Sequence, residues 1–363
     1  MNTKNIDWWK TSFGKKEIKL ISSSIKNKNI SQGAITKKFE DRLSKYLKVK
    51  NVIAVTSGTA ALTLILLSLR IKHTDEIILP NRTWIATAHS AAILGAKLVI
   101  ADTQKNLPII DENKIKKLIT KKTKAIIIVN INGRSVNIEK IKKIIGKRKI
   151  TIIEDSSQAI GSKHKKSFQG TIGDCGFFSL SVAKMISTGQ GGFITTNNDA
   201  FAKNLRLRRT HGLKSINNTL KYPMLGFNFR FNDILSSIGI AQLSLINIRI
   251  NKLKKIYKLY EMGIKNPDFK ILKVEIDKGE VPVYIEYLVN NRKKYLDYLQ
   301  KKGIGIRPFY PDISSAKYLN AKENNYKNTI FSSKGIYLPS GPDQSIDDIK
   351  RCIKIINAKK NFS

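Results

Sequence analysis

Residues 51–70 read NVIAVTSGTAALTLILLSLR: a short apolar run, a small polar turn and a longer apolar run. Val52–Val55 has the length and composition of a buried strand, and Ala60–Leu69 has the length of a helix. The TSGT turn between them would therefore lie where a strand ends and a helix begins. Backbone N–H groups at a helix start attract anions, so the turn is a candidate phosphate site. Ser57 would serve equally well as an ordinary helix N-cap.

The same alternation of apolar runs and amphipathic stretches continues to about residue 200. Further predicted strands are Glu76–Leu79, Lys97–Ala101, Ala125–Val129, Ile150–Ile153, Gly176–Leu180 and Gly192–Thr195. Helical stretches between them include Thr83–Leu94, Glu112–Ile119 and Ile138–Ile145. Several strands are apolar on both faces, as in a parallel sheet that helices cover on both sides. The pattern predicts an open α/β sheet.

The length of 363 residues indicates a large domain and a smaller one. We expect a large α/β domain over residues 51–231, a linking helix over 232–265 and a small C-terminal α+β domain over 266–363. Short strand and helix signals, punctuated by Gly303 and several prolines, support the last of these. Residues 1–50 are expected to form an N-terminal arm of helices that packs on the small domain.

The chain is strongly basic, with 66 Lys and Arg against 27 Asp and Glu and a formal net charge of +39. Such a charge is compatible with nucleic-acid binding, because basic side chains neutralise phosphates. The lysines are spread along the whole chain, however, and no basic tail or aromatic–basic platform stands out. This distribution argues against nucleic acid as the main partner, although a basic surface would attract an anionic small molecule.

No uninterrupted apolar run reaches the ~18 residues that a membrane helix needs. The first residues are polar and lack the apolar segment of a secretory signal. Cys175, Cys352 and four scattered histidines do not have the spacing of a metal site. We therefore expect a cytoplasmic protein without a membrane partner, a disulfide or a bound metal.

Ligands of open α/β sheets bind beyond the carboxyl ends of the strands, so the residues at those positions are candidates for chemistry. Trp84 follows the second strand and could stack on a flat ring or pack in the core. Glu154 and Asp155 follow the strand Ile150–Ile153, where a carboxylate could pair with a protonated ring nitrogen or cap a helix. Lys184 lies between an apolar strand and a glycine-rich turn, and burial there would lower its pKa and leave a neutral amine.

Each of these positions has an ordinary structural explanation, but together they match one ligand. They offer sites for a phosphate, a flat ring, a ring nitrogen that needs a carboxylate, and a carbonyl that needs an amine. Pyridoxal phosphate carries all four groups, and its usual partners are a lysine and an acid on the pyridinium nitrogen. We therefore expect pyridoxal 5′-phosphate as the cofactor.

In their order, these motifs resemble the DegT/DnrJ/EryC1/StrS aminotransferases, fold-type I pyridoxal-phosphate enzymes that aminate keto-sugar nucleotides. The resemblance covers about residues 10–355. It rests on SGTAAL (57–62), TW (83–84), EDSSQA (154–159), FS (178–179), Lys184 and TGQGG (188–192). It continues through SQG (31–33), FE (39–40), RTHG (209–212), GFNFR (226–230), GIRPF (305–309) and LPSGP (338–342).

The resemblance implies a role for each matching residue. Lys184 and Asp155 would be catalytic: Lys184 would hold the cofactor covalently and move a proton, and Asp155 would keep the pyridinium nitrogen protonated. Trp84 would stack on the ring, and Gln158 would contact it near its phenolic oxygen. The phosphate would be bound by Gly58, Thr59, Ser179 and, from the other subunit of a homodimer, Asn228. L-Glutamate would supply the amino group, and a nucleotide-linked keto sugar would receive it.

Two positions depart from the family pattern. Gln190 stands where members often have an acid, and Asn130 stands where members commonly have histidine. These departures bear on the substrate rather than on the cofactor. The sequence thus predicts an aminotransferase for surface polysaccharide or glycoconjugate synthesis. The alternatives are other pyridoxal-phosphate sugar chemistry, such as that of a dehydratase or lyase, and an inactive regulatory or nucleic-acid-binding protein. Dehydratases of the family replace the lysine by histidine, so Lys184 argues against that branch.

Overall fold

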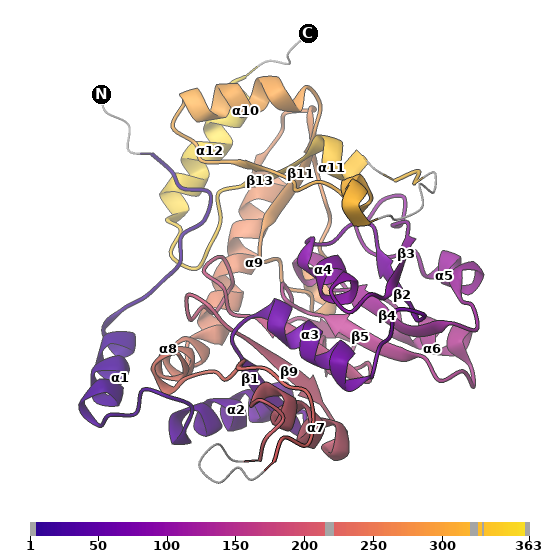
Figure 1. Cartoon of the computed structure of the whole chain (residues 1–363). Coiled ribbons are helices and arrows are strands. Elements are labelled where there is room, and N and C mark those ends of the chain that lie inside the picture. The colour runs from indigo at the N-terminus through magenta and orange to yellow at the C-terminus, as the bar shows by residue number, and fades with distance from the viewer. Residues whose placement is uncertain (1–4, 215–220, 320–325, 329, 360–363) are drawn as a thin grey trace.

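A seven-stranded sheet forms the centre of the larger part of the molecule (Figure 1). The structure, a computed structural model, describes residues 5–214, 221–319, 326–328 and 330–359. The strand order is β1-β9-β8-β5-β4-β2-β3, and β9 runs antiparallel to both of its neighbours while the other pairs are parallel. The strands are β1 (Asn51–Val55), β2 (Glu76–Pro80), β3 (Lys97–Ala101), β4 (Thr123–Val129), β5 (Thr151–Asp155), β8 (Cys175–Ser179) and β9 (Gly192–Thr196). The predicted mostly parallel α/β sheet is confirmed, with strand bounds within two residues of the prediction.

Helices cover the sheet on both faces, which explains why its strands are apolar on both sides. One face packs against α3 (Gly58–Ser68), α4 (Ala86–Ala92) and α7 (Asp199–Arg209), and the other against α2 (Ala34–Leu47), α5 (Glu112–Leu118) and α6 (Ile138–Ile145). Adjacent residues of β2 pack on opposite faces of the sheet. Ile77 packs with the apolar residues of α3, α4 and α7, and Ile78 packs with those of α5 and α6. Helix α3 is buried on nearly all sides, so its composition is apolar all round.

A smaller antiparallel sheet follows in the C-terminal part, with the strand order β10-β11-β13-β12. Its strands are β10 (Phe269–Ile271), β11 (Ile285–Val289), β12 (Arg307–Pro308) and β13 (Gly335–Leu338). Its helices are α10 (Arg292–Lys301), α11 (Ile330–Lys334) and α12 (Ile346–Ala358). Short elements elsewhere are the hairpin strands β6 (Lys163–His164) and β7 (Ser167–Phe168) and the 3₁₀ turns η1 (Ile131–Gly133), η2 (Ile276–Lys278), η3 (Ile313–Ser315) and η4 (Lys317–Leu319).

The expected single linking helix over 232–265 is wrong, because two helices occupy this stretch. They are α8 (Asp233–Leu243) and α9 (Ile246–Gly263), bent by 60° at the break between them. The Ser244 hydroxyl donates to the Ala241 carbonyl at 2.6 Å, and the Leu245 N–H donates to the Gln242 carbonyl at 3.1 Å. These tighter bonds replace the regular ladder and end α8.

The N-terminal segment is shared between the two domains, whereas all of residues 1–50 were expected to pack on the small one. Residues 5–10 do lie along the small domain, where Ile6 pairs with Ile304 and Trp9 with Ser340. The helices α1 (Lys15–Lys26) and α2, in contrast, contact α8, and α2 also contacts β1.

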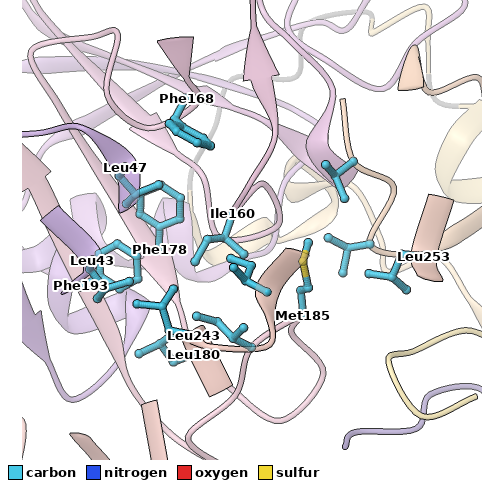
Figure 2. Packing of buried hydrophobic residues seen from close by; sticks show 14 of the residues in the cluster. Leu43, Leu47, Ile160, Phe168, Phe178, Leu180, Met185, Phe193, Leu243 and Leu253 are labelled. Carbon is cyan, nitrogen blue, oxygen red and sulfur yellow. The ribbon is translucent and has the colours of Figure 1, made fainter. Parts of the chain in front are cut away.

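The physical reason lies in the apolar face of α2. Leu43 and Leu47 are fully buried and lie close to Phe178 and Phe193 of the large sheet (Figure 2). Phe178 and Phe193 stack with ring centroids 4.5 Å apart. The sheet face around β8 and β9 offers α2 a broad apolar surface. Burial of apolar surface stabilises the fold by about 25 cal/mol per Å².

Among the described residues, no single helix is long and apolar enough to cross a membrane. The bent pair of α8 and α9 has, taken together, the length and composition of a membrane span, but α8 is largely buried against α1 and α2.

Candidate active site

A cavity of about 360 Å³ lies at the carboxyl ends of the central strands, between the large sheet and the small domain. Residues distant in the sequence meet there because parallel strands bring their carboxyl ends to one edge. Of the predicted site residues, it is lined by Gly58, Thr59, Trp84, Asp155, Gln158, Ser179 and Lys184. The remaining one, Asn228, does not line it.

The turn after β1 forms one end of the cavity. Ser57 caps α3, with its hydroxyl accepting a hydrogen bond from the Ala60 N–H at 3.0 Å. The N–H groups of Gly58 and Thr59 precede the first intrahelical bond and therefore remain available to an anion. Gly192 allows this packing, since a Cβ there would lie 2.7 Å from the Gly58 nitrogen. The geometry fits a phosphate group.

Asp155 ends β5 and lies buried in the floor of the cavity. Its carboxylate accepts hydrogen bonds from the Thr87 hydroxyl at 2.9 Å and from the Ser157 N–H at 3.1 Å. Burial nevertheless raises the pKa of Asp155, because these two bonds offset only part of the lost hydration. Within the described residues the carboxylate has no cation within salt-bridge distance, so a cationic ligand would complete the site.

Lys184 lies in the loop after β8 and lines the same cavity. Burial lowers the pKa of Lys184 to about 8, and the charge of Asp155 opposes this shift only in part. Tyr284 holds the loop in place, because its hydroxyl donates to the Ala183 carbonyl at 2.7 Å. The Lys184 Nζ lies 5.9 Å from the centroid of the Tyr284 ring. A lysine with this pKa is neutral often enough near pH 7–8 to attack a carbonyl.

Trp84, which follows β2, and Gln158, which follows β5, also border the cavity. The Trp84 side chain is 49% exposed, and Tyr310 meets it edge-on with ring centroids 5.4 Å apart. An exposed indole at the wall of a cavity leaves one face free for a planar ligand. The Gln158 side-chain oxygen accepts a hydrogen bond from the Asn132 N–H at 3.0 Å, which fixes the side chain at the rim of the site.

The two departures from the family pattern also border the cavity. Asn130 is buried and donates to the Ser156 hydroxyl at 2.9 Å and to the Glu154 carboxylate at 3.2 Å. It therefore supports the loop after β5. Gln190 is exposed.

Asn228 is not among the residues that line the cavity. It is exposed and pairs through its backbone with Thr210. Within a single chain it therefore does not reach the phosphate end of the site.

Sequence reasoning missed one wall of the cavity, which comes from the N-terminal segment and the small domain. The wall consists of Trp8, Tyr284, Arg307, Tyr310 and Tyr337. The signals were present in the tryptophans near the N-terminus and in the GIRPF motif, but nothing in the sequence shows that these segments face the large domain.

The cavity fits pyridoxal phosphate by the chemistry of its lining. It offers free N–H groups for a phosphate, a buried carboxylate without a cation and a lysine whose amine is partly neutral. Among the residues that the structure describes, no group of three or more His, Cys, Asp or Glu is placed to hold a metal ion.

Comparison with known proteins agrees with this arrangement. A model of the DegT/DnrJ/EryC1/StrS aminotransferase family matches residues 11–357. The GDP-perosamine synthase of Caulobacter vibrioides is 31% identical over 90% of this chain and 90% of its own length. Helicobacter pylori PseC, an aminotransferase involved in the biosynthesis of pseudoaminic acid, superposes with a TM-score of 0.90 at 26% identity, covering 97% of this chain and 98% of its own. An E. coli GDP-4-keto-6-deoxy-D-mannose-3-dehydratase with bound hydrated PLP superposes with a TM-score of 0.89 at 25% identity, covering 98% of this chain and 100% of its own.

Proposed function

Because the chain belongs to the DegT/DnrJ/EryC1/StrS aminotransferase family, we propose that it is a pyridoxal-phosphate enzyme that aminates a nucleotide-linked keto sugar. L-Glutamate is the amino donor, and the product serves the synthesis of a surface polysaccharide or glycoconjugate. The relatives act on nucleotide-linked sugars according to their names, which supports the substrate class. The observation that carries the proposal is the meeting of Lys184 and Asp155 in one cavity.

Each of the predicted site residues in the cavity has a separate role toward the cofactor. Bound pyridoxal phosphate supplies an electron sink that accepts and releases an amino group. The amides of Gly58 and Thr59, with the Ser179 hydroxyl, would hold its phosphate, and Trp84 would border its ring. Asp155 would keep the ring nitrogen protonated through charge. Lys184 would supply the amine that holds the cofactor and the base that moves a proton at the substrate carbon.

The test is an absorbance spectrum of the purified protein with pyridoxal phosphate, before and after addition of L-glutamate. The visible band of the lysine-bound cofactor should give way to the near-ultraviolet band of the amino form. A nucleotide-linked 4-keto-6-deoxyhexose should then restore the visible band. If no visible band forms after reconstitution, the proposal fails.

The pKa of Lys184 predicts how the apoprotein captures the cofactor. Only the neutral amine attacks, so the rate of covalent capture should rise ~tenfold per pH unit below pH 8 and level off above it. Reduction with borohydride and peptide mass analysis would measure this rate at Lys184. The Lys184→Ala variant serves as the control for labelling at other lysines. A capture rate at Lys184 that does not level off near pH 8 would contradict the prediction.

Asn228 tests whether two subunits share one site. We propose that it binds the cofactor phosphate of the partner, because it is exposed and lies outside the cavity of its own chain. In Asn228→Ala the affinity for pyridoxal phosphate should fall about tenfold, the effect of losing one hydrogen bond to a charged group. A mixture of Asn228→Ala and Lys184→Ala subunits should recover sites in which both residues are intact. If mixing restores no sites with wild-type affinity for pyridoxal phosphate, the two subunits do not share one site.

Dehydration of the sugar is the second candidate, because the E. coli dehydratase has the same fold. The two reactions differ in their products. With ¹⁵N-labelled L-glutamate, an aminotransferase transfers the label to the nucleotide sugar, whereas a dehydratase gives a product that has lost water and carries no nitrogen label. Lys184 favours amination.

A further inference from the structure

The rim of the cavity contains an arginine that the proposed chemistry of the cofactor does not use. Arg307 lies on the edge strand β12 and is exposed, with its guanidinium 5.3 Å from the centroid of the Trp8 ring. Both residues line the cavity. Within the part of the chain that the structure describes, Arg307 has no ion pair and no side-chain hydrogen bond, so its donors are available to a ligand.

Backbone pairing anchors both Arg307 and Trp8 to the small sheet. In β12, Arg307 pairs with Tyr337 of β13. The Trp8 carbonyl accepts a hydrogen bond from the Ser340 N–H at 2.9 Å, and Gly305 N–H donates to the Ile6 carbonyl at 2.6 Å. Side chains on anchored backbone keep their geometry, which a recognition site requires.

Gly305 makes this arrangement possible. A Cβ at this position would lie 2.8 Å from the Trp8 nitrogen and 2.6 Å from the Ile6 carbonyl oxygen. The glycine of the GIRPF motif therefore admits the N-terminal segment beside the strand. The arm thus contributes Trp8 to the cavity wall and leaves it half-buried next to Tyr284, with ring centroids 6.1 Å apart.

We propose that Trp8 and Arg307 form the subsite for the nucleoside diphosphate of the sugar substrate, an inference that rests on the proposed function. The Arg307 guanidinium binds the diphosphate, because its planar fork matches phosphate oxygens in pairs. The Trp8 indole packs against the nucleoside, because aromatic side chains stack on any base. The sugar then points inward, toward Lys184 and Asp155.

A carboxylate of L-glutamate is the competing occupant, because Arg binds carboxylates by the same geometry. The aromatic neighbour of the guanidinium favours the nucleoside diphosphate. An indole beside the guanidinium offers a flat apolar surface, which a nucleoside can cover and a dicarboxylate cannot. The excess of basic residues over the whole chain also favours the more highly charged diphosphate.

The test is equilibrium binding of GDP, UDP and dTDP to the reconstituted protein by calorimetry. At least one should bind, and Arg307→Ala should weaken its binding about tenfold or more, as expected for the loss of hydrogen bonds to a charged group. Trp8→Ala should also weaken binding, whereas Trp8→Phe, which keeps an aromatic ring and the packing of the arm, should retain most of it. Lys293→Ala removes an exposed charge from the same domain outside the cavity and should leave binding unchanged.

Two outcomes would overturn the inference. One is that no nucleoside diphosphate binds, or that Arg307→Ala binds it as wild type does. The other is that Arg307→Ala shifts the L-glutamate concentration needed for the spectral change and leaves nucleotide binding intact, which would assign the arginine to the donor. Failure of the proposed function would look different: the cofactor spectrum would not respond to L-glutamate, while nucleotide binding would still depend on Arg307.

Discussion

Replacing Lys184 by alanine should abolish transamination while the protein stays folded. The side chain projects into a cavity, and the described residues form no salt bridge with it, so its removal leaves no buried partner unpaired. The variant loses both the amine that attaches to the cofactor and the base that moves the proton. The turnover rate should therefore fall by a factor on the order of 10³ or more.

The measurement combines turnover with two other readouts. Mass spectrometry after borohydride reduction should show no cofactor attached to the Lys184→Ala chain, and thermal unfolding should match wild type. Lys166→Ala makes the same substitution at an exposed lysine and should change neither readout. Turnover within tenfold of wild type in Lys184→Ala would remove the role assigned to this residue.

Replacing Asp155 should keep some cofactor bound but slow the reaction strongly. The buried carboxylate is the charge that would hold a proton on the ring nitrogen, and loss of one such interaction in a buried site costs on the order of 10²–10³ in rate. Asp155→Ala also leaves the Thr87 hydroxyl and the Ser157 N–H without their acceptor. Asp155→Asn retains an acceptor of the same shape and separates the loss of charge from the loss of packing.

A second readout distinguishes this role from a structural one. The charge of Asp155 raises the pKa of Lys184, so Asp155→Asn should lower the pH at which Lys184 capture levels off below its wild-type position near 8. Asp297→Asn, on the exposed face of α10, removes the same charge elsewhere and should leave this profile unchanged. Wild-type turnover and an unshifted profile in Asp155→Asn would show that the carboxylate does not act on the ring or on the lysine.

The local elements were predictable because their signals are local. The sheet strands are continuous apolar runs of about five residues, and the turn at 56–59 lies between a strand and a helix in the sequence itself. Parallel strands bring their carboxyl ends to one edge by rule. That rule alone placed Trp84, Asp155 and Lys184 near one another, and all three line the cavity.

The linking helix and the N-terminal arm were misjudged for different reasons. Both α8 and α9 have helical composition, and the break between them is marked by the hydrogen bonds of Ser244 and Leu245, which the composition does not signal. For α2, the apolar stripe predicts that one face is buried, but not which surface buries it.

Sequence thus determined the α/β class, the strand order along the chain and the residues at the strand ends, since these follow from periodicity and from the direction of parallel strands. Tertiary structure alone decided the wall formed by Trp8, Tyr284 and Arg307, because it depends on the docking of the arm and the small domain through contacts distant in sequence. It also decided the chemical state of the two central groups. Burial, which no sequence pattern measures, lowers the pKa of Lys184 to about 8 and raises that of Asp155.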